Sequence, residues 1–307
     1  MNYKSVKEMA TKWGISERRV RVLCSEGRID GVIKVGRSWN IPEDATKPID
    51  YRNKFSLPFI GLTKNDFSSL SELHERLDSL RPLSHNQLKM IKEDMTLRWT
   101  YHSNAIEGNT LTLKETKVAL EGITIGGKTI TEHLEAINHK EAIEYLEEVS
   151  VSKLPLTERL IKELHYLILK QIDSKNAGVY RKENVIISGA KHKPPKYLEV
   201  PTLMEKLVHD YNNSYKHLHP VVKAALLHGE FVKIHPFVDG NGRTARILLN
   251  FSLMQEGLIP VVITKEQRLS YYDALDEAHT TLDYTKFIEM IKTLLLDELS
   301  YRLSIFE

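Results

Sequence analysis

Cysteine is almost absent from this chain, since Cys24 is the only one among 307 residues. No disulfide can therefore form within the chain, which fits a reducing compartment. Long apolar runs are absent too, because none approaches the roughly 20 residues of a membrane-spanning helix, and the N-terminus lacks a signal-peptide core. We expect a cytoplasmic protein without membrane contact. Cys24 should be a packing residue, because no metal-ligand cluster surrounds it in the sequence.

A strong charge of one sign is also lacking, with a formal net charge of +2. The charge is unevenly distributed, because residues 1–48 contain ten Lys and Arg against six Asp and Glu, whereas the rest of the chain contains 33 against 35. The basic excess is thus N-terminal. With 41% hydrophobic residues, a chain of this length can bury a sizeable core and form two domains.

The most informative stretch is residues 235–246, which read HPFVDGNGRTAR. Its proline and two glycines exclude a helix interior and predict a turn. The apolar residues 221–234 before it predict a buried helix that ends at His235, and residues 244–251 after it predict a second helix. The turn therefore places Gly242 at a helix N-terminus, where free N–H groups and the helix dipole attract anions.

Four side chains of this stretch have distinct chemistry. Arg243 and Arg246 lie three residues apart, so they project from one helical face towards the same anion. Asp239 is placed to hold Mg²⁺ on that anion, because magnesium usually takes one or two carboxylates together with phosphate oxygens. His235 can accept a proton from a hydroxyl near neutral pH. The residues by themselves therefore indicate a site at which a hydroxyl attacks a magnesium-bound polyphosphate.

The same stretch resembles the signature of the Fic family, H-P-F-x-D/E-G-N-G/K-R-x-x-R, at all nine specified positions, and the resemblance extends over roughly residues 60–300. It implies a mainly helical fold and the transfer of AMP from Mg-ATP to a Ser, Thr or Tyr hydroxyl of a protein, with Mn²⁺ as an alternative to Mg²⁺. In that reaction His235 would deprotonate the hydroxyl and Asp239 would hold the metal. Phe237 would anchor the loop.

The resemblance also implies the nucleotide-binding residues. Asn241 and the N–H groups of Gly240 and Gly242 would bind the α-phosphate, and the two arginines would hold the β- and γ-phosphates. Catalysis would then depend on positioning and charge stabilisation, as in phosphoryl transfer. The complete set is Gly240, Asn241, Gly242, Arg243, Thr244 and Arg246 of the motif, Val185, Ile186, Ile187 and Ser188 of a flap, and Tyr271 beside the adenine.

A second motif, residues 103–109, reads SNAIEGN and ends a predicted helix, because its final Gly-Asn favours a left-handed cap. It resembles the inhibitory motif of Fic proteins, S/T-x-x-x-E-G/N. By that resemblance Glu107 pairs with Arg246 and occupies the place of the ATP γ-phosphate. An arginine engaged by a carboxylate cannot also bind a phosphate. The inhibitory residues implied are Ser103, Glu107 and Asn109, in a helix over about 100–109.

A flap and a linker complete the predicted fold. Residues 185–188 have β-type composition and are followed by Gly189 and two prolines, which predicts a short β-hairpin over about residues 183–195. We call this segment the flap loop, because in Fic proteins its equivalent lines the nucleotide and aligns a target segment by strand addition. The expected fold class is a mainly α Fic-domain helical bundle over residues 67–307 with this hairpin, reached through a linker and docking arm at residues 49–66.

The N-terminal residues 1–48 form a separate pattern. Helical spacing over 3–12, a turn at Gly14, a basic helix over 17–24 and a glycine-bounded hairpin over 27–37 resemble the winged helix-turn-helix of the excisionase and MerR-like group. The alternative is a protein-docking module with a solvated basic face. The DNA contacts implied by the resemblance are Arg18, Arg19 and Arg21 in the major groove, with Lys34 and Arg37 near phosphate.

Several functional alternatives stay open. Glu107 could instead activate water to remove AMP from a modified protein, and the donor could be UTP or a phosphocholine nucleotide. The Fic domain could also serve as a nucleotide sensor in a DNA-binding regulator. The partners expected are a target protein, which can be the chain itself, DNA at residues 1–48, and a second copy in a homodimer. His165 is expected to be a core or boundary histidine, and Glu132 and Glu135 to form a solvated helix face.

Overall fold

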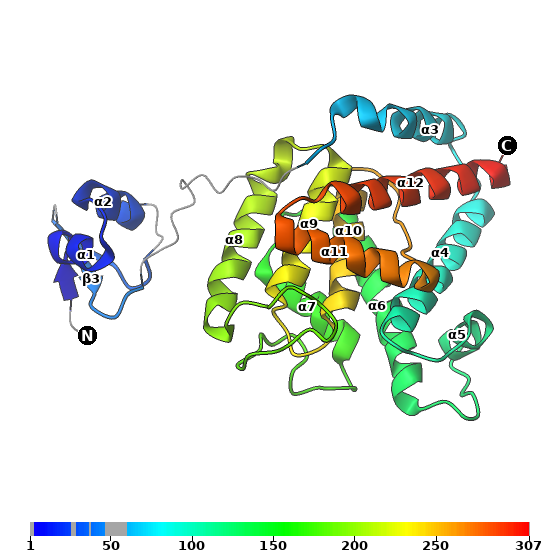
Figure 1. Ribbon diagram of the computed structural model, residues 1–307, viewed down its shortest axis with the longest axis horizontal. Coiled ribbons are helices and arrows are strands. Elements are labelled where there is room, and N and C mark those ends of the chain that lie inside the picture. The colour runs from blue at the N-terminus through cyan, green and yellow to red at the C-terminus, as the bar shows by residue number, and fades with distance from the viewer. Residues whose placement is uncertain (1–2, 26–28, 37, 47–59, 307) are drawn as a thin grey trace. The chain divides into compact units, whose positions relative to one another are not determined.

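The computed structural model describes residues 3–25, 29–36, 38–46 and 60–306 (Figure 1). The chain divides into two compact units, Met1–Phe55 and Ser56–Glu307. Most of the predicted linker over 49–66 lies outside the described residues, as does Arg37. Among the described helices, none has the length and hydrophobicity to cross a membrane.

The N-terminal unit contains two helices and a three-stranded antiparallel sheet. In chain order its elements are β1 (Tyr3–Ser5), α1 (Val6–Trp13), α2 (Glu17–Ser25), β2 (Ile33–Val35) and β3 (Ser38–Pro42). The strand order is β1-β3-β2, with Tyr3 opposite Pro42 and Ile33 opposite Asn40. A hairpin is thus present but displaced from the predicted 27–37, because β3 is its second strand.

Local sequence explains how α1 begins and ends. Ser5 Oγ accepts a hydrogen bond from Glu8 N (3.3 Å) and Glu8 Oε2 accepts one from Ser5 N (2.8 Å), which is a capping box. The helix therefore starts directly after Ser5, within the predicted helical spacing over 3–12. Gly14 ends it with φ 62°, a left-handed conformation that glycine adopts easily. Cys24 is 5% exposed and packs in the core of this unit, as expected.

The elements described in the second unit are all helices, which confirms the mainly α expectation. They are η1 (Lys64–Phe67), α3 (Ser68–Ser79), α4 (His85–Ile106), α5 (Leu113–Leu120), α6 (Ile130–Val151), α7 (Glu158–Leu169), η2 (Tyr197–Glu199), α8 (Val200–Asn212), η3 (Tyr215–His217), α9 (Pro220–Ile234), α10 (Asn241–Gln255), η4 (Lys265–Gln267), α11 (Arg268–Thr281) and α12 (Thr285–Phe306).

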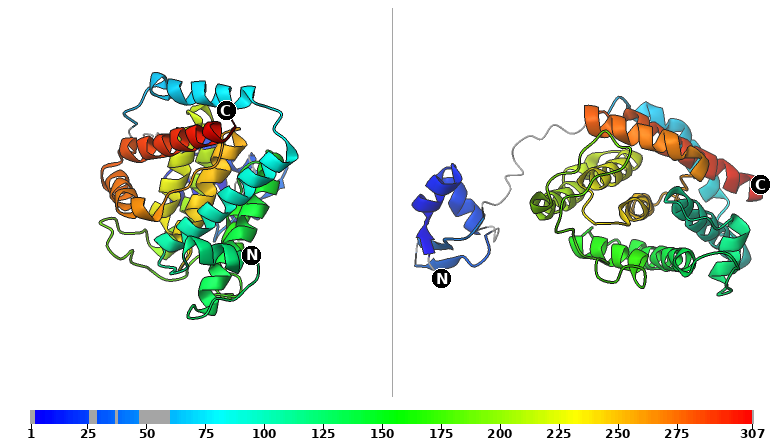
Figure 2. Two further views of the ribbon diagram at one scale, coloured as in Figure 1. Left: turned by 90° about the vertical axis from the view of Figure 1, so that its right-hand side faces the viewer. Right: turned by 60° about the horizontal axis from the view of Figure 1, so that its bottom comes forward.

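Helices α9 and α10 form the centre of this unit. Figure 2 shows α10 in the middle of the bundle, where it contacts α9, α6, α7 and α4. All residues of α10 from Arg243 to Leu253 are buried. A helix that is apolar nearly all round is stable only inside a protein, which explains this central position. Asn250, a polar residue of this core, exchanges two hydrogen bonds with the Val261 backbone, both 2.9 Å.

Gly229 lets the Tyr284 ring pack directly against α9. A Cβ added to Gly229 would lie 2.4 Å from Tyr284 Cε1, inside van der Waals contact. The Tyr284 hydroxyl donates to Glu230 Oε1 (2.6 Å), so the ring cannot move without breaking that bond. The close approach of α9 to the segment before α12 therefore depends on a glycine at this position.

We predict that Gly229→Ala destabilises the second unit. Overpacking of a core costs about 1–3 kcal/mol, which exceeds the gain of up to about 1 kcal/mol from alanine in a helix. Guanidinium denaturation monitored by circular dichroism measures the difference. Gly126→Ala is the matched control, because nothing lies within 4 Å of its added Cβ and its φ is not in the left-handed region. Equal stability of the Gly229→Ala and unaltered proteins would contradict the packing argument.

Candidate active site

His235 is the C-cap of α9 and has φ 50° and ψ 60°, a left-handed conformation that non-glycine residues seldom adopt. Burial lowers the pKa of His235 to about 4, against the opposing effect of a polar contact with the Val232 backbone. The Glu107 and Asp239 carboxylates also oppose this shift, whereas the Arg181 cation adds to it. His235 is therefore neutral at pH 7 and can accept a proton.

Asp239 lies in the loop between α9 and α10 with its side chain 66% exposed. Its Oδ1 accepts a hydrogen bond from Gly240 N (2.6 Å), and its Oδ2 lies 3.3 Å from Arg243 Nη2. A single exposed carboxylate fits Mg²⁺, which usually completes its coordination with phosphate oxygens and water. Within the described part of the chain, no cluster of three or more His, Cys, Asp or Glu could hold a metal ion. A metal at Asp239 would therefore depend on ligands from a bound anion.

The first turn of α10 brings backbone N–H groups to this loop. Gly240 has φ 73° and is the N-cap of α10. The side chain of Asn241 is already engaged, because Oδ1 accepts from Phe237 N (3.0 Å) and Nδ2 donates to Phe237 O (2.9 Å). Thr244 is fully buried, and its hydroxyl has no hydrogen-bond partner among the described residues. Asn241 thus shapes the loop, while the helix N-terminus faces the place predicted for phosphate.

Arg243 is 3% exposed and lies between two carboxylates. Its Nη1 donates to Glu135 Oε1 of α6 (2.8 Å), while Nη2 faces Asp239. The side chain of Glu135 is only 17% exposed, so the prediction of a solvated face is wrong for this residue. A glutamate on a helix shows no sign in the sequence of a partner 108 residues away. Glu135 neutralises the buried Arg243 cation. A glutamate on a solvated face would have no such partner.

Asn109 connects the Arg243–Glu135 pair to the end of α4. Its Nδ2 donates to Glu135 Oε2 (2.8 Å) and to Glu132 O (3.0 Å). Glu132 Oε1 accepts from Thr110 N (2.9 Å) and from Thr110 Oγ1 (2.5 Å). The Thr110 hydroxyl, together with backbone hydrogen bonds, lowers the pKa of Glu132 to about 2. Both glutamates therefore hold the turn that follows α4, and Glu132 is not simply solvated either.

Arg246 is engaged by the C-terminal end of α4. Its Nε donates to Ser103 Oγ (3.0 Å), and its Nη2 donates to Ser103 O (2.8 Å) and to Glu107 Oε1 (2.7 Å). Burial is the strongest single influence and lowers the pKa of Arg246, but the Glu107 carboxylate and the Tyr271 hydroxyl together outweigh burial, and the pKa is raised. A Cβ at Gly242 would lie 2.3 Å from Glu107 Oε1, so glycine lets the carboxylate reach α10. The contact implied by the resemblance is thus present.

His165 of α7 supports the loop, a role that its sequence position did not reveal. Its ring stacks on Phe237 with centroids 3.6 Å apart and an interplanar angle of 5°. His165 Nε2 lies 2.8 Å from Asp239 O, and Nδ1 accepts from Gly178 N (2.8 Å). Burial lowers the pKa of His165 to about 4, so the neutral ring donates from Nε2 and accepts at Nδ1. These contacts are those of a core histidine, as predicted, and the buried Phe237 anchors the loop.

The flap loop contains no strand among its described residues, so the predicted β-hairpin is wrong. Ala190 N donates a hydrogen bond to Ile187 O (3.2 Å), which closes a turn. Side chains replace a β-ladder as partners of the backbone, because Arg181 Nη1 donates to Glu183 O (2.9 Å) and Nη2 donates to Pro195 O (2.6 Å). Composition predicted the turn but not these side-chain partners.

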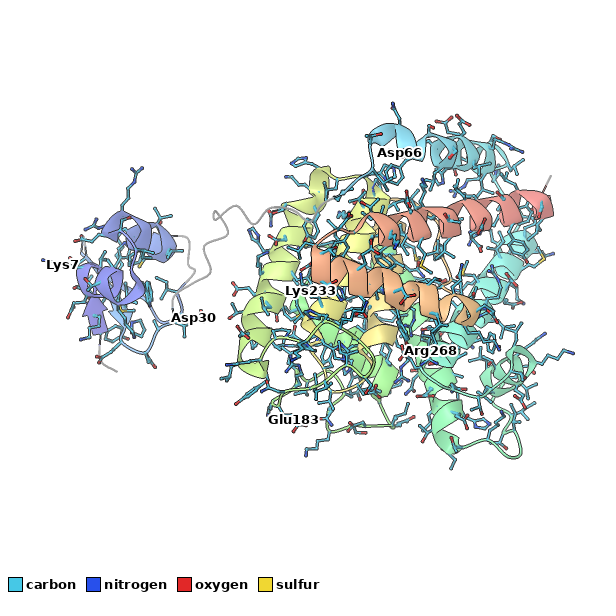
Figure 3. The ribbon with its side chains drawn as sticks, in the orientation of Figure 1. Lys7, Asp30, Asp66, Glu183, Lys233 and Arg268 are labelled. Atoms are coloured by element: carbon cyan, nitrogen blue, oxygen red, sulfur yellow. The ribbon has the colours of Figure 1, made fainter. Side chains whose placement is uncertain are left out.

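The tip of the flap loop contacts α9 and α11. Lys191 N lies 3.2 Å from each carboxylate oxygen of Asp276, and His192 Nε2 lies 3.0 Å from Lys233 O. Figure 3 labels Lys233, a residue of α9, and shows Glu183 at the outer edge of the second unit. Within the predicted nucleotide-lining segment 185–188, Ile186 is 92% exposed and Val185 and Ile187 are half-buried.

Tyr271 lies in the interior of the second unit. It is 1% exposed, and its hydroxyl lies 3.0 Å from Nε2 of the buried His228. Burial raises the pKa of Tyr271, and the nearby Arg246 cation opposes this shift. The place of Tyr271 beside the adenine stays a prediction. The neighbouring Tyr272 is 38% exposed. Consecutive residues of a helix point to different faces, so Tyr271 and Tyr272 differ in exposure.

The predicted DNA contacts in the N-terminal unit are only partly described. Arg18 is exposed on α2. Arg21 Nη2 pairs with Glu17 Oε2 (2.7 Å), and Lys34 Nζ lies 5.2 Å from the centroid of the Trp39 ring. Arg37 and the side chain of Arg19 lie outside the described part of the chain.

Comparison with known proteins agrees with the geometry of the second unit. Residues 155–253 match the model of the Fic/DOC family. A Fic-domain-containing signaling protein from Bacteroides thetaiotaomicron superposes with a TM-score of 0.72 at 33% identity, covering 78% of this chain and 97% of that chain. Fic-1 from C. elegans superposes with a TM-score of 0.70 at 31% identity, covering 78% and 72%. The chain therefore belongs to the Fic/DOC family.

Curated relatives match over the same part of the chain. Protein adenylyltransferase Fic of Drosophila mojavensis is 39% identical over 230 residues, which are 74% of this chain and 45% of that protein. The protein of the same name from Drosophila melanogaster is 37% identical over 250 residues, which are 81% of this chain and 47% of that protein. The chain thus spans about half the length of the curated relatives it matches.

We predict that stability falls as the pH is lowered from 7 to 5. Burial lowers the pKa of His165, His235 and His279 to about 4, and lowers that of His139 and His228 well below the ordinary value. Between about pH 6.5 and pH 4 the unfolded chain binds protons that the folded chain does not. Each such group therefore lowers the free energy of unfolding by up to about 1.4 kcal/mol per pH unit.

Guanidinium denaturation at pH 7, 6 and 5 measures this slope. His217→Gln, at an exposed position in η3, should leave the slope as it is in the unaltered protein. A free energy of unfolding that is independent of pH over this range would contradict the buried, neutral state of the five histidines.

Proposed function

We propose that this chain transfers AMP from ATP to a hydroxyl side chain of a protein. The observation that carries the proposal is a neutral His235 and an exposed Asp239 flanking a helix N-terminus with two buried arginines. The names of the curated relatives support the same reaction. The target is a protein with an accessible Ser, Thr or Tyr hydroxyl, and a second copy of this chain meets that description.

In the proposed reaction His235 accepts the proton of the target hydroxyl. The hydroxyl oxygen forms a bond to the α-phosphorus of ATP, and the bond from the α-phosphorus to the bridging oxygen breaks, so that pyrophosphate leaves. Burial suits His235 to this role because the ring is neutral before the reaction. The Asp239 carboxylate, which favours the protonated ring, stabilises the imidazolium once the proton has arrived.

The phosphates would bind at the first turn of α10. Its N–H groups and the positive end of the helix dipole attract the anion. Glu135 holds Arg243 by Nη1 and leaves Nη2 directed towards Asp239, where the metal and phosphates would lie. Mg²⁺ bound at Asp239 would neutralise negative charge on the phosphates. The contribution of Glu135 is to keep Arg243 in place, because a guanidinium anchored at one end presents its other end without reorganisation.

We propose that Glu107 restrains this activity. Its Oε1 occupies Arg246 Nη2, and Ser103 accepts two further hydrogen bonds from the same guanidinium. Among the described residues only Nη1 of Arg246 lacks a partner, so little of the guanidinium is available for a phosphate while α4 keeps this position, and the carboxylate repels the nucleotide. The same engagement does not favour removal of AMP through Glu107, because a carboxylate oxygen bound to arginine is a poor base for water.

We predict that Glu107→Gly raises protein labelling by α-labelled ATP and Mg²⁺ about 10- to 100-fold. A charge-assisted hydrogen bond is worth about 1.5–3 kcal/mol, and its loss frees Arg246 for the nucleotide. In the same background, His235→Ala should lower labelling about 10²–10⁴-fold, the usual contribution of a general base, while ATP binding is retained. Autoradiography and titration calorimetry provide the two measurements.

Equal labelling of the Glu107→Gly and unaltered proteins would overturn the inhibition proposal. Labelling by the Glu107→Gly protein that persists without His235 would overturn the role of His235. ATP binding without any labelling would overturn AMP transfer and would indicate another donor, which parallel reactions with UTP and a phosphocholine nucleotide would identify.

As a second and separate activity, we propose that the N-terminal unit binds DNA. Residues 1–48 have the basic excess, and α2 follows α1 across the Gly14 turn with Arg18 exposed. DNA phosphate attracts exposed cations, and such binding weakens steeply with salt.

We predict that Arg18→Ala weakens DNA binding and lowers the slope of log affinity against log salt concentration by about 1, as expected for the loss of one phosphate contact. Fluorescence anisotropy with a labelled duplex measures both quantities. Lys216→Ala, an exposed cation of the second unit, is the control. Salt-independent binding, or no binding at low salt, would favour a protein-docking role for this unit.

A further inference from the structure

Arg181 is a buried arginine whose hydrogen bonds all go to backbone carbonyls. It is 3% exposed, and burial lowers its pKa. Nε donates to His235 O (2.8 Å), Nη1 to Glu183 O (2.9 Å) and Nη2 to Pro195 O (2.6 Å). No carboxylate is among its partners in the described part of the chain. A buried charge is stable only when its donors are satisfied, so the three carbonyls must stay in place around it.

These three carbonyls belong to two functional segments. Glu183 and Pro195 are the two ends of the flap loop, so Arg181 closes the base of that loop. His235 is the proposed general base. It is also the left-handed residue at which α9 ends and the loop to α10 begins, and the hydrogen bond to its carbonyl holds this conformation. The Arg181 backbone adds a fourth bond, because its N–H donates to Pro236 O (2.9 Å).

We propose that Arg181 is a positioning residue that holds the base of the flap loop and the backbone of His235 in one geometry. The catalytic consequence rests on the proposed function. A target segment aligned along the flap loop must bring its hydroxyl within hydrogen-bond reach of the His235 ring. Since one guanidinium binds both the loop and the histidine backbone, their separation is set by a planar group of fixed shape. A misplacement of about 1 Å lowers a rate by up to about 10²-fold.

The geometry of the guanidinium distinguishes this role from charge alone. Arg181 uses three different nitrogens, which point in diverging directions in the guanidinium plane, to reach three carbonyls. Lysine keeps the charge but concentrates its donors on one atom, and therefore cannot bind all three carbonyls at once. Arg181→Lys thus tests the geometry of the three guanidinium nitrogens, and Arg181→Gln tests this geometry and the charge together.

The experiment compares Arg181→Lys, Arg181→Gln and Arg159→Gln, each in the Glu107→Gly background. Arg159 is the matched control, because its side chain is 87% exposed on α7 and pairs with Glu163 away from these carbonyls. Hydrogen–deuterium exchange of peptides covering residues 183–195 and of peptides from α10 measures opening of the flap loop independently of any reaction. Kinetics of AMP transfer to protein and calorimetry of ATP binding measure its consequence.

We expect amides of the flap loop to exchange at least about tenfold faster in both Arg181 variants, with unchanged exchange in α10. The kcat for transfer should fall about 10- to 100-fold, whereas the Kd for ATP should change less than about threefold. A merely structural role would instead raise exchange in α10 as well. Arg159→Gln should match the parent in every measurement.

Two results would overturn the proposal. One is an unchanged hydrogen–deuterium exchange rate of the flap loop in Arg181→Lys, which would mean that the three guanidinium nitrogens do not hold the loop. The other is faster exchange of the loop together with an unchanged kcat, which would mean that the loop and His235 are not coupled. If the Glu107→Gly parent transfers no AMP, the proposed function fails, but the exchange experiment still decides whether Arg181 holds the loop.

Discussion

The structure of the second unit depends on keeping two arginine charges inside a helical core. Arg243 and Arg246 lie in the first two turns of α10 and are each 3% exposed. Buried guanidinium groups require carboxylates or carbonyls close by, since an unpaired charge in the interior is costly. Glu107 from α4 and Glu135 from α6 supply them. The requirement to neutralise these charges therefore fixes where α4 and α6 approach α10.

The two pairs differ in what they leave available. Glu135 binds one end of Arg243, while the other end faces the exposed Asp239. Glu107 and Ser103 together occupy Nε and Nη2 of Arg246. The first arrangement leaves one end of the Arg243 guanidinium beside the exposed loop, and the second leaves only Nη1 of Arg246 without a partner among the described residues. Asn109 contacts Glu135 as well as the turn after α4, so a movement of α4 would affect both arginines.

In the loop between α9 and α10, neutral groups hold Phe237 and Asp239, whereas the Arg181 cation holds the carbonyl of His235. His165 stacks on Phe237 and binds the Asp239 carbonyl, and Asn241 closes the loop onto the Phe237 backbone. Neutral donors and acceptors fix a backbone without adding a net charge. The charges that act on His235 are therefore mainly the Arg181 cation and the Glu107 and Asp239 carboxylates, and burial outweighs the carboxylates to keep the ring unprotonated.

What the sequence by itself determined is local. The composition of residues 235–246 predicted a turn into a helix with a base, a carboxylate and two arginines, and helical periodicity predicted a mainly α fold. The Glu107–Arg246 contact was implied by a resemblance rather than by spacing. These features depend on neighbouring residues or on a complete motif, which a linear sequence contains in full.

Only the tertiary structure decided the partners of these residues. Glu135 meets Arg243 across 108 residues, and Arg181 meets His235 across 54. The flap loop is stabilised by the Arg181 side chain instead of a β-ladder, and Tyr271 is buried with its hydroxyl against His228. Propensity describes one segment at a time, whereas burial and hydrogen bonding depend on which segments the core brings together. That is why the chemistry of the site could be predicted and its supporting contacts could not.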